Sequence, residues 1–396
     1  MSPSTTPHPS PQELHLLYVL LDSNLPTGGF VSSSGLESYA KHGFLSSTTY
    51  SSSSSSTLPP NGSGQKQGKG SGSKVGVLNG VVEFASAEVA NFGSTTGGFV
   101  RDAWGMVDHG LNLAKANRDD KGKGKEEVDG TRDHHQKAEE EEEMGSSVLD
   151  RIVGNITALD RYHEATLLSH VARRSSKAQG VAMLTLFTRG LSKPVGLYQD
   201  NDIEDERDHD QEQRGSGAED TKMVVGEDKG AIGSGMDGED EVLAKDIVDA
   251  YKKTIRKGES PGHLAVCYGV IARAMALSLD RAIHLHLFLH ARSLLSSAVR
   301  LNLIGPYASS QLLLHPFRQI IDTEVKEIKQ RSEGDMFRNQ SVSYDGGHPA
   351  TMHHGHGEEV FWAWTEEAER GPATTWPLGE VLTGRHDLQH SRIFNS

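Results

Sequence analysis

The sequence predicts an all-α protein, a single-domain helical bundle interrupted by long disordered insertions. Three observations support this. Apolar residues recur at helical spacing in most of the hydrophobic segments, and no run of alternating β-branched residues competes with them. Only 35% of the 396 residues are hydrophobic, so the ordered part is smaller than the chain. We expect a disordered N-terminus at 1–9 and a helical domain over 10–396.

Four stretches have the composition of disordered chain, because they contain too little apolar surface to offset chain entropy. They are a Ser/Gly-rich run, a Lys/Glu run, an acidic run and a polar loop with histidines: 46–74, 117–147, 200–241 and 330–357. Run 200–241 has 16 acidic and 4 basic residues, and run 117–147 has 11 and 6. The net charge of these two runs together is −17. The net charge of the whole chain is −14, so the rest of the chain is at about +3.

The first helix is predicted just after Ser10. Its apolar positions recur at i, i+3, i+4 and i+7: Leu14, Leu17, Tyr18 and Leu21. Ser10 is a suitable N-cap, Pro11 fits the first helical position, and Glu13 can bond back to the cap. The helix should end before Leu25-Pro26, since the residue before proline avoids the helical region.

A second helix is predicted from a capping box at Ser34 and Glu37. It ends at Lys41 and His42, with Gly43 as terminator. A tight Pro-Thr-Gly-Gly-Phe turn at 26–30 separates the two helices.

Further helices are predicted from apolar spacing in the rest of the chain. Their apolar positions lie at 81–92, 149–159, 181–187 and 243–255, followed by a pair of helices over 263–303 and a last helix over 307–330 that is kinked at Pro316. The tail after Leu378 is short and polar, and we expect it to order on docking, with Ile393 and Phe394 as anchors.

Several features bear on the compartment and exclude broad classes of partner. A single cysteine, Cys267, rules out an internal disulfide, and the polar N-terminus lacks the features of a signal peptide, so we expect a cytoplasmic protein. The most apolar stretch, 264–279, is too short for a membrane span and contains Arg273. The pI of 5.8 gives no indication of a nucleic-acid partner.

Two common catalytic motifs are absent from the sequence. A phosphate-binding loop requires Gly-Lys-Ser/Thr, but Gly68-Lys69 is followed by Gly70. A hydrolase elbow requires Gly-x-Ser-x-Gly, which the serine run 32–34 does not provide. Asp22 and Glu37 flank the turn as a possible carboxylate pair, yet acid–base catalysis needs a third partner and a pocket. We therefore do not expect an enzyme.

Histidines offer a possible metal site. Four of them gather beside two glutamates in the polar loop: His348, His353, His354 and His356. Imidazole is a good nickel ligand, but a composition-biased loop can be His-rich without binding metal tightly. His286 and His290 share a helix face at i and i+4, and we interpret them as core histidines.

The segment LLDSNLPTGGFVSSSGLESYAKHG resembles the N-terminal signature of the UreF family of urease accessory proteins, which reads Asp-Ser-x-x-Pro-x-Gly-Gly-aromatic, then Gly-Leu-Glu. Three further segments resemble the family in the same order along the chain: ARRSSKAQG at 172–180, SAVRLNLIGPYASSQ at 297–311 and RHDLQHSRIFNS at 385–396.

The resemblance implies a helical homodimer that binds the accessory protein UreD (also called UreH) and recruits the GTPase UreG. UreG delivers nickel to apo-urease, so no cofactor bound tightly by this chain is implied. The positions implied at the partner surface are Asp22, Pro26, Gly28, Gly29, Phe30, Glu37, Arg300, Arg392 and Phe394. Two alternatives stay open: a metallochaperone acting through the histidine cluster, and a GTPase-activating factor that inserts Arg392 or Arg300.

Overall fold

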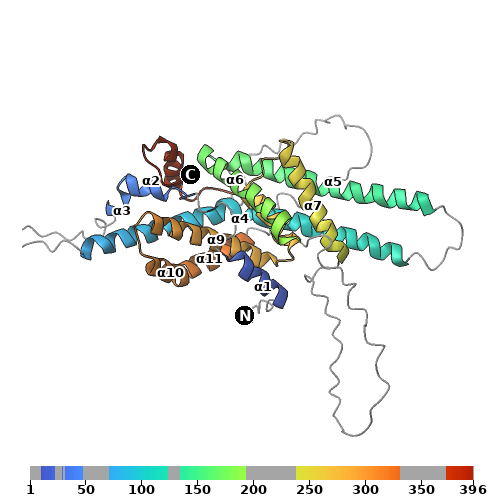
Figure 1. The fold of residues 1–396 in the computed structure, drawn as a ribbon, viewed down its shortest axis with the longest axis horizontal. Helices are drawn as coiled ribbons and strands as arrows, with labels where there is room; N and C mark the ends of the chain where they lie inside the picture. The colour runs from blue at the N-terminus through green and yellow to red at the C-terminus, as the bar shows by residue number, and fades with distance from the viewer. Residues whose placement is uncertain are drawn as a thin grey trace, which may run out of the picture.

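The computed structural model describes residues 10–22, 29, 32–47, 71–123, 134–192, 238–330 and 372–395. Within these ranges the chain forms helices and loops without a β-strand, which confirms the all-α prediction (Figure 1). In chain order the helices are α1 (Pro11–Leu20), α2 (Leu36–Lys41), α3 (Phe44–Ser47), α4 (Ser71–Lys123), α5 (His134–Thr166), α6 (His170–Leu186), η4 (Phe187–Leu191), α7 (Gly238–Arg256), α8 (Leu264–Ala274), α9 (Leu279–Arg300), α10 (Pro306–Leu314), α11 (Pro316–Gln330), α13 (Pro377–Gly384) and η6 (His386–Leu388).

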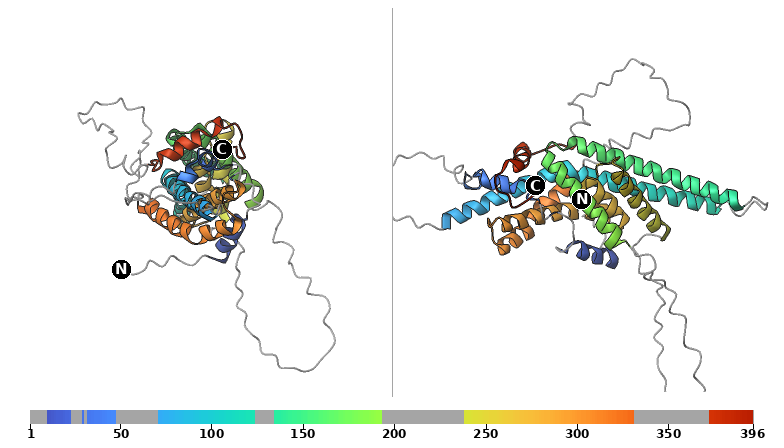
Figure 2. Two further views of the ribbon diagram at one scale, coloured as in Figure 1. Left: turned by 90° about the vertical axis from the view of Figure 1, so that its left-hand side faces the viewer. Right: turned by 45° about the horizontal axis from the view of Figure 1, so that its top comes forward.

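Helix α4 is the centre of the bundle, with α5, α8, α9 and α11 packed against it (Figure 2). It supplies a buried apolar stripe whose first members, Val81, Phe84 and Val89, have the predicted spacing. Helix α8 is buried on nearly all sides, because α4, α6, α7 and α9 surround it. Fully burying one such large apolar side chain stabilises the fold by roughly 2 kcal/mol.

Helix α6 approaches α8 closely at Gly180. A Cβ atom at Gly180 would lie 2.2 Å from the carbonyl oxygen of Gly262, so only glycine fits at this crossing. One turn earlier, the Ser176 hydroxyl accepts a hydrogen bond from the N–H of Leu264 at 3.1 Å. These contacts fix α6 against the core and thereby position Arg174.

A buried carboxylate on α5 closes the loop between α7 and α8. Asp160 accepts hydrogen bonds from the hydroxyls of Tyr251 (2.8 Å) and Ser260 (2.6 Å) and from the N–H groups of Gly262 (2.6 Å) and His263 (3.0 Å). A buried charge without partners would be strongly destabilising, and four donors remove that cost. We interpret this network as structural.

The predicted start of the first helix is confirmed. The Ser10 hydroxyl accepts the N–H of Glu13 at 3.1 Å, and Pro11 is the first helical residue. The Glu13 carboxylate does not return to the cap, however. It accepts hydrogen bonds from Ser278 and pairs with Arg281 at the start of α9, which holds α1 on the bundle.

The capping box predicted for the second helix is wrong. The N-cap is Gly35, with φ of 84° and no side-chain cap, and Ser34 also has a positive φ of 48°. The Ser34 N–H donates instead to the Ser32 hydroxyl at 3.2 Å. Glu37 is buried and bonds elsewhere, because the C-terminal residues supply better donors. The predicted terminator, Gly43, is confirmed with φ of 80°.

Helices extend into the edges of three stretches predicted as disordered. The stretch 117–147 is helical at both ends, since α4 continues to Lys123 and α5 begins at His134. Likewise α3 ends at Ser47, α4 begins at Ser71 and α7 begins at Gly238. In the stretch 117–147, Lys, Glu, Gln and Ala are good helix formers, so a helix nucleated in an apolar segment propagates into the polar run beside it. The remainder of each stretch, together with 1–9 and 331–357, lies outside the described residues.

The remaining predicted helices are present. The kink expected at Pro316 is a break between α10 and α11. His286 is buried, as predicted, with its Nε2 3.1 Å from the Thr96 hydroxyl and its ring stacked on Phe92. His290 stacks on Phe92 as well, at 3.6 Å between ring centroids. Among the described helices, none is long and apolar enough to cross a membrane.

Candidate docking face

The C-terminal tail, which we define as residues 385–395, is folded against the rest of the chain. We expected the chain after Leu378 to order only on docking, but α13 packs on α2 and α6, and η6 follows it directly. Figure 1 shows this segment, in red, beside α2 and α6. The order comes from specific contacts with α2, α6 and α9.

Glu37 on α2 binds the backbone of the tail. Its carboxylate accepts the N–H groups of Ile393 at 2.8 Å and Phe394 at 3.2 Å, and it also pairs with Lys41 at 2.9 Å. Burial by itself would raise the pKa of Glu37. The hydrogen bonds from Lys41, Ile393 and Phe394 outweigh burial and hold the pKa below its usual value. The ionised carboxylate of Glu37 is therefore the hydrogen-bond acceptor that holds the backbone of the tail.

Asp387 in η6 ties the tail to α6. Arg174 binds its carboxylate through two parallel hydrogen bonds of 3.0 Å each and also donates to the carbonyl oxygen of Asn395. Arg392 reaches the same carboxylate at 2.7 Å, and His170 lies 3.1 Å from it. The hydrogen bond from Arg174 is the main reason why the pKa of Asp387 lies well below its usual range.

The side chain of Phe394 is buried against other residues of the same chain and is only 3% exposed. The guanidinium of Arg300, at the end of α9, lies over its ring at 4.7 Å from the centroid. The buried His386 ring contributes Nε2 at 3.0 Å from the carbonyl oxygen of Phe394. Phe394 thus supports the face from within, and a partner does not reach it while the tail is seated.

The turn before α2 is fastened to α9. The hydroxyl of Ser293 donates to the carbonyl oxygen of Gly29 at 3.0 Å, and that of Ser297 to Ser32 at 3.1 Å. Arg292 donates to the carbonyl oxygen of Leu21, beside the exposed Asp22. The predicted site residues Pro26, Gly28 and Phe30 lie outside the described residues.

We name the surface formed by α2, the tail and the turn at Gly29 the docking face. Two large apolar side chains of the tail point outward: Leu388 is 72% exposed and Ile393 is 63% exposed. Arg392 keeps 40% of its side chain exposed beside them. Exposed apolar and arginine side chains on rigid backbone are typical of protein interfaces.

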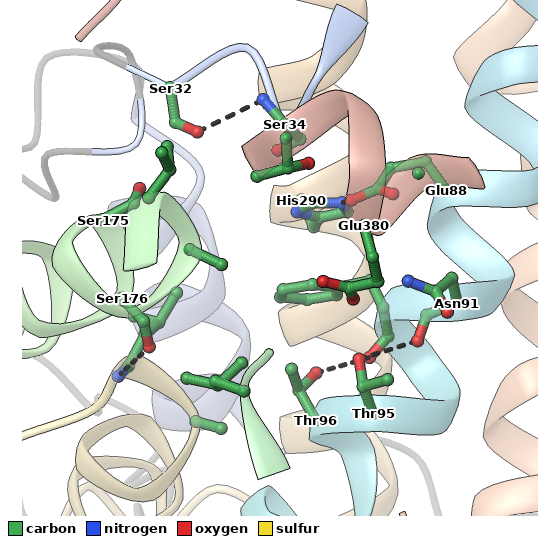
Figure 3. A pocket seen from close by; sticks show the side chains of 18 of the residues that line it. Ser32, Ser34, Glu88, Asn91, Thr95, Thr96, Ser175, Ser176, His290 and Glu380 are labelled. Carbon is green, nitrogen blue, oxygen red and sulfur yellow. Dashed lines mark hydrogen bonds and ion pairs between the residues drawn. The ribbon is translucent and has the colours of Figure 1, made fainter. Parts of the chain in front are cut away.

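A cavity of 120 Å³, lined by both polar and apolar side chains, lies behind the docking face, where α4, α6, α9 and α13 meet (Figure 3). Glu88 and His290 face each other across it, 3.5 Å apart. Glu380 enters from α13, and burial together with the charge of Glu88 raises its pKa. A cavity of this size, with Glu88, His290 and Glu380 in its lining, has room and polar partners for water molecules.

Several hydroxyl groups around the cavity form hydrogen bonds with backbone groups. Ser32 accepts the N–H of Ser34, Ser176 accepts that of Leu264, and Thr95 donates to the carbonyl oxygen of Asn91 at 2.8 Å. These bonds stabilise the loop before α2 and the start of α8, so we interpret the cavity lining as structural. Sequence reasoning missed this cavity, because its residues come from segments scattered between Ser32 and Thr383.

The predicted metal ligands His348, His353, His354 and His356 lie outside the described residues. In the described part of the chain, no group of three or more His, Cys, Asp or Glu side chains is placed to hold a metal ion.

Sequence reasoning also missed four residues that order the tail: Lys41, Arg174, His386 and Asp387. Each lies in a segment that resembles the UreF family, and that resemblance was the only available signal. Their pairing joins positions more than 200 residues apart in the case of Arg174 and Asp387, which no local pattern reveals.

The known proteins that this chain resembles are urease accessory proteins. The family model described as UreF matches residues 81–316. "Urease accessory protein 6" of Cryptococcus neoformans var. grubii is 52% identical over 394 residues, which cover 98% of this chain and 99% of that protein. "Uncharacterized urease accessory protein UreF-like" of Schizosaccharomyces pombe is 28% identical over 38% of this chain and 48% of its own length. The UreF of Paenarthrobacter aurescens is 34% identical over 18% of this chain and 33% of its own. No solved structure matches.

Proposed function

Because this chain belongs to the UreF family of urease accessory proteins, we propose that it is a non-catalytic scaffold for urease maturation. Two copies of the chain form a homodimer in the cytoplasm, and this homodimer binds UreD (UreH). The assembly recruits the GTPase UreG and assists the insertion of nickel into apo-urease. Nickel is the cargo of the whole complex, and this chain binds no cofactor tightly.

One observation supports a scaffold above all: the four segments that resemble the family meet at the docking face. Glu37 of the first segment binds the backbone of the fourth. Arg174 of the second binds Asp387 of the fourth, and Arg300 of the third covers Phe394. Segments scattered from 20 to 396 are thus used to build one surface of the molecule.

The arrangement suits docking better than catalysis. The charged groups of the face mostly satisfy one another and the tail backbone, whereas Leu388 and Ile393 remain outside. Because the tail is already ordered by these contacts, a partner that binds it does not have to order it. Preorganisation of this kind lowers the entropic cost of association.

The test is reconstitution with the accessory proteins of the same host. We expect the full-length chain to co-purify with tagged UreD and UreG homologues, and deletion of its gene to abolish urease activity. Ile393→Asp and Phe30→Ala are expected to weaken the complex, whereas Arg151→Ala, an exposed change on α5, serves as the matched control. Failure of the wild-type chain to form a ternary complex, or urease activity that persists in the deletion strain, would contradict the proposal.

A further inference from the structure

A second hollow lies at the edge of the docking face, between the end of α2 and the tail. It has a volume of 290 Å³. We name it the basic pocket and define it by the side chains of Lys41, His42, Arg385, Leu388, Gln389 and His390.

The lining of the basic pocket is positively charged. Lys41 and Arg385 are cationic side chains, His42 and His390 add imidazole rings, and no carboxylate lines the pocket. Lys41 pairs with Glu37, but that carboxylate is buried and shared with the N–H groups of the tail. Positive charge at the pocket is therefore only partly compensated.

Several donors of the pocket are available. Among the described residues, the side chains of Arg385 and His390 make no hydrogen bond or ion pair, and both residues are exposed. His42 has Nδ1 2.7 Å from the carbonyl oxygen of Ser38, so Nδ1 donates there and Nε2 is left for another partner. A guanidinium with unused N–H groups favours a carboxylate or phosphate as its ligand.

An apolar side chain borders these cations. Leu388 lines the pocket and is 72% exposed. A free inorganic anion would leave Leu388 in water, whereas a polypeptide that brings a carboxylate together with apolar side chains would cover both. The size of the pocket also favours a side chain with its neighbours over a single small ion.

We propose that the basic pocket receives an Asp or Glu side chain from an acidic, partly apolar segment of a protein partner. The inference rests on the proposed scaffold function and adds to it the chemistry by which one partner is recognised. Arg385 and His390 contact the carboxylate, and Leu388 packs against the residues beside it.

The experiment uses the full-length chain and the purified accessory proteins of the same host, with affinities measured at low and high salt. Charge reversal by Arg385→Glu, alone and with His390→Glu, is expected to weaken binding about tenfold or more and to flatten its salt dependence, as for interfacial charge pairs. Arg151→Glu on α5, outside the pocket, should leave both unchanged. Amide exchange at Phe394 must stay slow in every variant, which shows that the tail remains seated.

A photoreactive phenylalanine analogue at position 388 identifies the occupant. A cross-link to a partner segment that contains Asp or Glu, lost with Arg385→Glu, supports the proposal; a cross-link to a segment without acidic residues overturns it. Inorganic phosphate that binds the free chain and displaces the partner overturns it as well, since the site is then one for small anions. If the wild-type chain forms no complex, the scaffold function fails and the pocket proposal with it. If the complex forms and charge reversal behaves like Arg151→Glu, only the pocket proposal fails.

Discussion

The carboxylate of Glu37 accepts the backbone N–H of Phe394 at 3.2 Å, across 357 positions of the sequence. It accepts the neighbouring N–H of Ile393 as well, at 2.8 Å. One side chain near the start of the chain thus determines how the end of the chain is presented. Removing it leaves two donors at a largely buried site without their acceptor.

Glu37→Ala is therefore expected to release the tail. Leaving buried N–H groups unsatisfied costs about 1–3 kcal/mol. Hydrogen exchange over 385–395 should become fast, with a lower thermal midpoint. Glu37→Gln keeps one acceptor oxygen and should give an intermediate result. Asp246→Asn, an exposed change on α7, is the control. Unchanged exchange in Glu37→Ala would show that Arg174 and Arg300 hold the tail without Glu37.

Acid should loosen the tail. The pKa values of Glu37 and Asp387 are both lowered in the folded chain. For a carboxyl group with a lowered pKa, stabilisation is complete above the unfolded pKa of about 4 and is lost as the pH falls through the folded value. Protection of the Ile393 amide should thus be constant near neutral pH and fall below about pH 4. Loss of protection between pH 7 and 5 would point to histidines instead.

A second pH effect is expected from the core. Burial lowers the pKa of His163 and of His286 to about 3 in each case. The unfolded chain takes up these protons near pH 6.5, so each histidine destabilises the fold increasingly as the pH drops from about 6.5 toward 3. In His163→Gln, the slope of unfolding free energy against pH should decrease by up to one proton between pH 6 and 4. An unchanged slope would mean that His163 is protonated in the folded state.

Gly35 is a sensitive position between α2 and α13. Its φ is 84°, and a Cβ atom would lie 3.0 Å from the Thr383 hydroxyl oxygen. Gly43 has a similar φ of 80° but open space around it. Gly35→Ala and Gly43→Ala should each cost about 1–2 kcal/mol for the left-handed backbone. Only Gly35→Ala should also speed hydrogen exchange in α13. Equal exchange in both variants would show that the contact with Thr383 is not limiting.

The parts of the fold that the sequence predicts are those decided by neighbours in the chain. The Ser10 cap is confirmed because its acceptor and donor are three residues apart. The same kind of pattern at Ser34 and Glu37 is misleading, since a distant segment competes for the Glu37 carboxylate and wins. Arg174 and Asp387 lie in segments that resemble the family, yet nothing in either segment indicates that they pair. The docking face depends on such long-range pairs, which local periodicity does not reveal.

The histidine cluster can be tested by deletion. Neutral imidazoles bind nickel, so if the cluster has a metallochaperone role, deleting 348–359 should remove the nickel binding that calorimetry detects on the full-length chain. Deleting 51–62, a Ser-rich stretch of equal length without histidine, is the control. We expect urease maturation at ample nickel to survive the histidine deletion, because nickel is the cargo of the complex. If only the histidine deletion abolished urease maturation, the result would show that this chain itself binds the nickel that is delivered.

Arg392 distinguishes docking from direct action on a GTPase. Its guanidinium pairs with Asp387 at 2.7 Å, and this bond keeps it on the surface beside Ile393. If Arg392 is part of the docking face, Arg392→Ala should weaken recruitment of the GTPase and lower urease maturation. The thermal midpoint should stay nearly unchanged. Arg392→Lys should retain part of the recruitment. An arginine inserted into a GTPase site accelerates hydrolysis by roughly 10³–10⁵-fold. A loss of that size in the GTPase rate with binding intact would therefore identify Arg392 as a catalytic arginine, and lost binding identifies it as a docking residue. Because the side chain is already committed to Asp387, we expect the second outcome.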